Sequence, residues 1–289
     1  MDKKVKALTV AACSIASVVI VEFLLGFAVN SLAIMSDAAH ALLDFVSILT
    51  LLFATRFSLK PPDEEHMYGH EKIEVFGGFI GGIILLFTAI FLVVEAIQRV
   101  LNGELLNLDW EIAGFAAIGY TFSMDVLRVK VLHPLEHDGA TVKAGFYHAI
   151  ADLGSTLIAL FGFGLATLGF YYFDSFASII LCAVLGYLST GLIKECFADL
   201  IDYAPRSVVK NVKEILDKSI GDASKVKKVK VRKAGNKILV EIVIKLPANM
   251  SVENAHTITS KAEEEIKSAF EKVEIITHVC PDSNSCSHY

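Results

Sequence analysis

The sequence of 289 residues has few cysteines, and nothing in their placement predicts a disulfide framework. It also lacks a strong excess of one charge: the formal net charge of -6 mixes both signs, so no nucleic acid is expected as a partner. Three of the five cysteines lie in or at the end of apolar segments, and two lie near the C-terminus, which fits a reducing compartment for the tail. They are Cys13, Cys182, Cys196, Cys280 and Cys286.

Long apolar runs, by contrast, are abundant, since 54% of the residues are hydrophobic. The first run, 5–29, has no convincing signal-peptide cleavage pattern and is long enough to span a bilayer. Connections rich in Lys and Arg, with Arg128 counted among them, alternate with connections that have almost none. This predicts an integral membrane protein of the cell (inner) membrane with both termini cytoplasmic. The six transmembrane helices are predicted over 7–28, 31–56, 73–99, 111–130, 142–170 and 175–196.

The third predicted span opens with the glycine-rich stretch "GGFIGG". Gly77 and Gly81 are four residues apart, as are Gly78 and Gly82. Small residues at this spacing let a second helix approach closely. We therefore predict a helix-packing face here.

The chain changes character after "YAPRS", which predicts a transmembrane domain over 1–204 and a cytoplasmic domain over 205–289. In the second part, helical spacing is followed by two alternating strands around the turn "AGN", then a helix capped by Ser251 and a last strand. The order αββαβ predicts a small α+β domain. Its basic run, residues 225–233, is interpreted as the solvated face of a strand, with binding to anionic lipid as the alternative.

Two of the predicted spans carry the same pair of polar residues. His40 and Asp44 are four apart in the second span, and His148 and Asp152 are four apart in the fifth. On a helix this spacing places both side chains on one face, and Asp37 extends the face of the second span by a turn. Ionisable groups within a bilayer are costly unless they are paired or hydrated, so each pair requires a partner.

Two imidazoles and two carboxylates supply four nitrogen and oxygen ligands, the number and kind that a tetrahedral divalent site uses, with zinc as the best fit. For a single pair, hydrogen bonds to the same helix, for example to Ser47 or Ser155, would be the simpler explanation. The repetition in two spans favours the metal site. Because both pairs lie near the middle of their spans, a bound ion would be about equally far from either face, as alternating access requires.

The sequence resembles a known family. The stretches "SLAIMSDAAHALLDF", "HMYGHEKIEVFGG" and "KAGFYHAIADLGST" are similar to the signature regions of the cation diffusion facilitators, which are six-span transporters of divalent metals with a cytoplasmic C-terminal domain. The resemblance covers nearly the whole chain. It implies a homodimer that exports metal, most often zinc, in exchange for protons, with His40, Asp44, His148 and Asp152 as the transport site.

The resemblance also implies roles for three residues around that site. Asp37 would support the ligands or lie on the exit path of the ion, with a purely structural role as the alternative. Lys72 and Asp202 match a charge pair that locks two subunits together in relatives, although either charge could also anchor the chain at the membrane surface. The proton coupling has independent chemical support, because histidine titrates near neutrality and binds metal only in its neutral form, which would give His40 and His148 the coupling role.

Two further metal sites are expected outside the membrane. Asp63, His66 and His70 lie in a polar loop, at positions that often bind a metal in the family. The resemblance also implies a regulatory site in the C-terminal domain. This site would consist of His256, His278 and Cys280, with Cys286 or His288 as a further ligand; a domain that only dimerises is the alternative. Lys227 and Val243 stand where relatives with two metals have histidines, so a single metal, regulatory Zn²⁺, is expected.

Three other functions are alternatives to zinc export. A membrane metal sensor would use the same ligands without transport, and a transporter mainly for Cd, Co, Fe or Mn would use them with another ion. An intramembrane hydrolase needs an open coordination position, which a four-ligand site does not leave. The stretch "HEKIE" also lacks the second histidine of a zinc-protease motif. We therefore expect a secondary active transporter and not an enzyme.

Overall fold

The computed structural model describes residues 2–28, 32–102, 112–166, 173–220, 226–235, 237–270 and 272–282. The chain forms two compact units, Met1–Phe197 and Ala198–Tyr289. The sequence predicts the division after residue 204, whereas packing places it within the last turn of the sixth helix.

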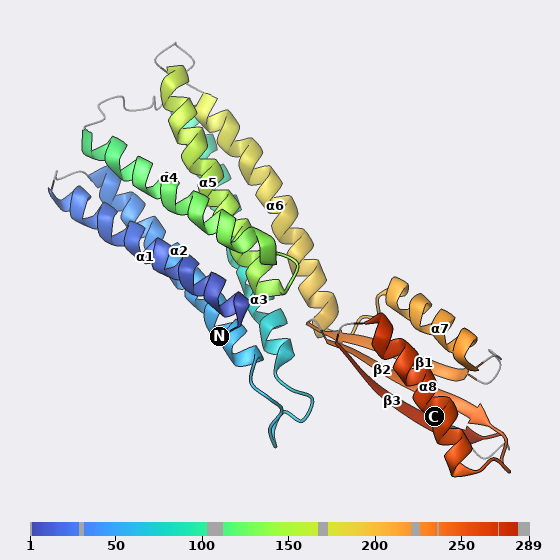
Figure 1. Cartoon of the computed structure of the whole chain (residues 1–289). Coiled ribbons are helices and arrows are strands. Elements are labelled where there is room, and N and C mark those ends of the chain that lie inside the picture. The colour runs from blue at the N-terminus through green and yellow to red at the C-terminus, as the bar shows by residue number, and fades with distance from the viewer. Residues whose placement is uncertain are drawn as a thin grey trace. The chain divides into compact units, whose positions relative to one another are not determined.

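The first unit consists of six long helices that run side by side (Figure 1). Their bounds agree with the predicted spans to within a few residues, because uninterrupted apolar runs of this length favour helices that satisfy their own backbone hydrogen bonds. A short 3-10 helix, His133–Leu135, follows the fourth. The six are α1 (Lys3–Ala28), α2 (Leu32–Ser58), α3 (Glu71–Asn102), α4 (Ile112–Leu132), α5 (Ala140–Ala166) and α6 (Phe173–Leu200).

Glycines on α3 allow this helix to approach its neighbours closely. A Cβ atom on Gly77 would collide with Ala54 of α2. A Cβ atom on Gly81 would lie 2.8 Å from Leu51 of α2 and 3.0 Å from Ala144 of α5. The predicted packing face of "GGFIGG" is therefore confirmed, and it places α3 between the two helices that carry the His and Asp pairs.

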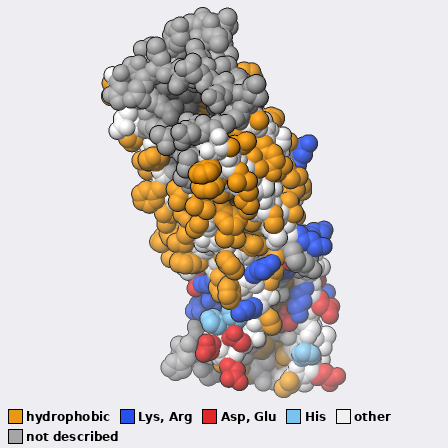
Figure 2. Space-filling view, turned by 90° about the vertical axis from the view of Figure 1, so that its left-hand side faces the viewer, with side chains coloured by type: hydrophobic (Ala, Val, Ile, Leu, Met, Phe, Trp, Pro, Cys, Tyr) orange, Lys and Arg blue, Asp and Glu red, His pale blue; other side chains and the backbone are white. Residues whose placement is uncertain are grey.

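The surface of the first unit is suited to lipid. Within the described residues, four helical stretches are long and apolar enough to cross a membrane: Lys3–Ala28, His40–Ser58, Glu71–Gln98 and Ile179–Leu200. Figure 2 shows a broad belt of hydrophobic side chains on the face of the first unit that it presents. Large side chains such as Phe27, Phe87 and Tyr187 are mostly exposed on them. A surface of this kind would be unstable in water and indicates burial in a bilayer.

The second unit has the predicted order αββαβ: α7 (Arg206–Ile220), β1 (Val226–Ala234), β2 (Lys237–Leu246), α8 (Val252–Ala269) and β3 (Val273–Pro281). β2 lies in the middle, antiparallel to β1 and parallel to β3. Gly235 has a φ of 61° in the hairpin turn, a left-handed conformation that glycine adopts readily. Ser251 caps α8 as predicted, since its hydroxyl accepts a hydrogen bond from the backbone N–H of Asn254.

The core of the second unit lies where α7 and α8 cover the sheet. Strand side chains of alternating positions meet the apolar faces of both helices, as the period of two in the strands predicts. The fully buried members include Val212 and Leu216 of α7, Ile242 and Ile244 of β2, and Ile266 of α8. This separate core explains why the 289-residue chain divides into two units.

Candidate metal sites

The pair on α2 has the geometry expected from its spacing. His40 Nε2 lies 3.8 Å from Asp44 Oδ2, one helical turn away. The His40 side chain is 45% exposed and that of Asp44 is 13% exposed. Asp44 also interacts electrostatically with Asp152 of α5 and with Arg128 of α4. The side chain of Asp37 lies outside the described part of the structure.

His148 on α5 is oriented as a metal ligand would be. It is only 4% exposed, and its ring forms a hydrogen bond with the backbone of Gly81 on α3. Its Nε2 atom has no hydrogen-bond partner among the described residues. In metal sites one ring nitrogen commonly donates to a carbonyl while the other binds the ion. The glycine face on α3 therefore serves His148 as well as packing, which the sequence does not reveal.

Asp152, one turn after His148, is held by α4. Arg128 Nη1 donates to Asp152 Oδ2 at 2.7 Å and to Asp125 Oδ1 at 3.1 Å. Arg128 is predicted to belong to a polar connection between spans, but its side chain is 4% exposed and paired within the helices. Asp125 is missed altogether. The signal that could have found both is a pair of opposite charges, three apart, inside an apolar span.

The four predicted ligands do not form a compact group in this conformation. Among the described residues, a different set of three possible ligands has its atoms all within 4.8 Å of one another. His40, Asp44, His148 and Asp152 are all described and are not part of it. Asp152 is turned instead toward Arg128.

That compact set is the predicted loop cluster, Asp63, His66 and His70. Asp63 Oδ1 lies 3.2 Å from His66 Nδ1, and Asp63 Oδ2 lies 3.2 Å from His70 Nε2. The backbone N–H of His66 donates to the Asp63 carboxylate, and this bond holds the pKa of Asp63 below its usual value. The carboxylate therefore remains ionised and able to bind a cation at any pH near neutrality.

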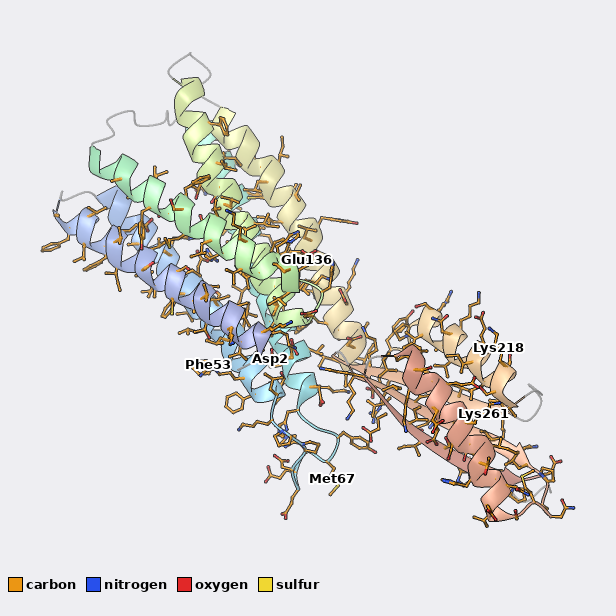
Figure 3. The ribbon with its side chains drawn as sticks, in the orientation of Figure 1. Asp2, Phe53, Met67, Glu136, Lys218 and Lys261 are labelled. Atoms are coloured by element: carbon orange, nitrogen blue, oxygen red, sulfur yellow. The ribbon has the colours of Figure 1, made fainter. Side chains whose placement is uncertain are left out.

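A tight turn fixes the two histidines of the loop cluster. Gly69 has a φ of 94°, and its N–H donates to the carbonyl of His66 at 2.9 Å. The turn brings the two rings together, with 4.5 Å between centroids and 37° between the ring planes. His70 is buried, and its Nδ1 has no partner among the described residues. The nearby Met67 extends outward from the loop, beyond the ends of the helices (Figure 3).

The predicted C-terminal ligands are distributed over two elements. His256 lies on α8, with its Nε2 atom 3.4 Å from the hydroxyl of Ser260. His278 and Cys280 are two apart on β3, so they share a face of the sheet. Cys280 is fully buried in the sheet. Cys286 and His288 lie outside the described residues.

Sequence models of two domains match the chain consecutively. The cation efflux transmembrane domain matches residues 8–201, and the cytoplasmic domain of cation efflux proteins matches residues 204–282. The chain belongs to the cation diffusion facilitator family. This confirms the predicted fold class, a six-helix membrane domain followed by a small α+β domain, and the transport of divalent cations. Membership of this family also agrees with the expectation that the protein is a transporter and not an enzyme.

Several curated facilitators are similar over most of the chain. The manganese efflux system protein MneP of Bacillus subtilis is 26% identical, with 89% of each chain covered. The zinc transporter ZitB of Yersinia pestis is 26% identical over 72% of this chain and 66% of its own. The cadmium, cobalt and zinc/H(+)-K(+) antiporter of B. subtilis is 25% identical over 70% of this chain and 65% of its own.

The residues expected to join two copies of this facilitator lie at element ends. Lys72 is in the first turn of α3. Asp202 follows α6 with a φ of 59°, and its carboxylate lies 3.5 Å from Arg232 of β1. Lys233 likewise lies 3.7 Å from Asp199, so part of the basic run forms ion pairs within its own unit. These pairs favour the interpretation of that run as the polar face of a strand.

Proposed function

We propose that this facilitator exports divalent cations, zinc first, by binding them within the membrane to His40, Asp44, His148 and Asp152. The observation that carries the proposal is His148, whose buried Nε2 has no partner while the ring is fixed by Gly81. A buried nitrogen left without a hydrogen bond is costly, and a metal ion would satisfy it. Asp152 lies one turn away and Asp44 interacts with it electrostatically, so α2 and α5 offer ligands to one region.

Two histidine nitrogens and two carboxylates suit tetrahedral zinc, and one relative is named a zinc transporter. Manganese is the second candidate. Asp125 adds a third carboxylate beside Asp152, and oxygen ligands suit Mn²⁺. MneP, which aligns with 89% of this chain, is named a manganese efflux protein.

Exchange for protons follows from the ligands, since protons and metal compete for the same imidazoles of His40 and His148. One relative is named as an antiporter that uses H⁺. We place both termini on the cytoplasmic side of the cell membrane, and α1, the α2–α3 loop and the α4–α5 connection meet at one end of the helices (Figure 1). The working form is a homodimer joined by domain 205–289 and by Lys72 and Asp202, with Asp37 supporting the ion path.

The loop cluster and the C-terminal ligands would then act as secondary sites. Asp63, His66 and His70 already lie at ligand distance from one another and would bind a metal at the cytoplasmic end. A regulatory metal at His256, His278 and Cys280 would bind to α8 and β3 of the second unit.

The deciding experiment is metal uptake into proteoliposomes, followed with dyes for Zn²⁺, Mn²⁺ and protons. We expect Zn²⁺ uptake coupled to proton movement, and loss of both in His148→Ala and Asp152→Ala. Ser155→Ala is the matched control on the same helix, because its hydroxyl bonds only to the backbone of Asp152 in the described structure. Uptake unchanged in the two ligand variants would refute this transport site. Metal binding without any uptake in the wild type would favour the sensor, and faster Mn²⁺ than Zn²⁺ uptake would favour the manganese exporter.

A further inference from the structure

Arg128 and Asp125 of α4 form a buried ionic cluster with Asp152 of α5. The shorter of the two Arg128 bonds, 2.7 Å, goes to Asp152 on the other helix, and the longer, 3.1 Å, goes to Asp125 on its own. Thr156 of α5 donates to the second oxygen of Asp125 at 3.2 Å. Arg128 and Asp125 have side chains only 4% and 3% exposed.

A cluster of this kind needs an explanation, because moving charges from water into a membrane domain is costly even when they are paired. If Arg128 only neutralised Asp125, its stronger bond would not go to a residue of the proposed transport site. The guanidinium also interacts with Asp44 of α2, so it lies among carboxylates from three helices. Its Nε atom has no partner in the part of the chain that the structure describes.

From this geometry we infer that Arg128 is a built-in counter-cation of the transport site, which the transported metal displaces from Asp152. This rests on the proposed function. A cation that binds Asp152 must break the 2.7 Å bond, and Arg128 then keeps Asp125, to which it is already bonded. When the metal leaves, the tethered guanidinium returns to Asp152. The carboxylate is thus paired in both halves of the cycle, and the competition weakens metal binding enough to permit release.

Arg128 is a positioning residue in this scheme. Its replacement should change the metal affinity in the direction opposite to that expected for a structural residue. Replacing a residue with only a structural role would weaken metal binding. Replacing a competitor would strengthen metal binding, because the metal no longer has to break a charge-assisted hydrogen bond. We expect Kd to fall by about tenfold, the size of one such bond. Turnover should fall at the same time, since release of the ion becomes slower.

The test uses the purified full-length protein with His66→Ala and His70→Ala as background, so that the loop cluster does not contribute. Zn²⁺ binding is measured by titration calorimetry, and Zn²⁺ uptake is measured in proteoliposomes. Mn²⁺ is left out of this test because Asp125 is itself a candidate ligand for Mn²⁺. Arg128→Gln alone leaves Asp125 buried and unpaired, which could prevent folding. The decisive variant is therefore Asp125→Asn with Arg128→Gln, which removes both charges. Arg128→Lys retains the charge and should stay near the background Kd.

The expected result is tighter binding with slower uptake in the double variant. Equal or weaker binding there, in a protein that elutes as the background protein does, would overturn the role of Arg128. Asp152→Ala in the same background separates the two proposals. If it abolishes binding while the double variant leaves Kd unchanged, only the counter-cation role fails. If the background protein neither binds nor transports metal, the transport site itself fails, and the role of Arg128 fails with it.

Discussion

The loop cluster and the proposed intramembrane ligands, His40, Asp44, His148 and Asp152, offer the same chemistry in two different structural settings. Asp63, His66 and His70 come from one short loop, and a single turn at Gly69 brings their atoms within 4.8 Å of one another. The intramembrane ligands come from α2 and α5, which are far apart in sequence. Their arrangement depends on α3, which fixes His148, and on α4, which binds Asp152.

This difference suits the two settings to different tasks. A site fixed by local backbone bonds has one geometry and can retain an ion. A site built from several packed helices changes whenever those helices shift, which is what alternating access requires. The proposed intramembrane ligands should therefore control flux, and the loop cluster should control only how much metal is held at its own end of the helices.

The largest effect is expected from replacing matched carboxylates in the two regions. Asp44→Asn should lower Zn²⁺ uptake by about 100-fold or more, because it removes a ligand where the membrane supplies no water to replace it. Asp63→Asn should leave most of the uptake intact. Initial rates in proteoliposomes at equal protein density are the measurement. Equal losses in both variants would show that the loop is part of the transport path, and would remove the distinction between the regions.

The sequence is sufficient for whatever depends on local pattern. Apolar runs predict the six helices, and alternation of apolar residues predicts the strands. The four-residue spacing predicts that each His and Asp pair shares one face of α2 or α5. The loop cluster was also predictable, since its three ligands are close in sequence. The αββαβ order and the Ser251 cap have the same local origin.

What the sequence could not supply are the contacts between helices. The position of Arg128 near the end of its apolar run predicts a residue of the polar connection, yet its side chain is buried within the helices and binds Asp152. Gly81 indicated close packing, but its backbone contact with His148 depends on the rotation of α3 relative to α5. Period and spacing contain no information about such rotations.

The next largest effect should come from disturbing that packing. Gly81→Val places a branched side chain against Leu51 and Ala144 and shifts the backbone that holds His148. Uptake should fall by about tenfold, and the free energy of unfolding should fall by about 1–3 kcal/mol. Flux and thermal unfolding in detergent are measured together. Gly186→Val on α6 is the matched control, because a Cβ atom there would meet nothing within 4 Å among the described residues. Comparable losses in the control would mean that any branched residue in these helices is harmful, and that Gly81 has no special link to His148.

The smallest effect on flux should come from the loop. His66→Ala removes one of three ligands from a site that is 51% exposed at this residue, so uptake should change by no more than about twofold. Calorimetry should nevertheless show one fewer metal bound per protomer, because Asp63 and His70 alone leave too few ligands to hold it. His137→Ala is the matched control: this histidine lies in the α4–α5 connection, 86% exposed, next to the Glu136 labelled in Figure 3. Unchanged metal stoichiometry in His66→Ala would mean that the loop cluster is held together by its own hydrogen bonds and binds no ion. A large loss of uptake would instead make the loop the entry step for the intramembrane ligands.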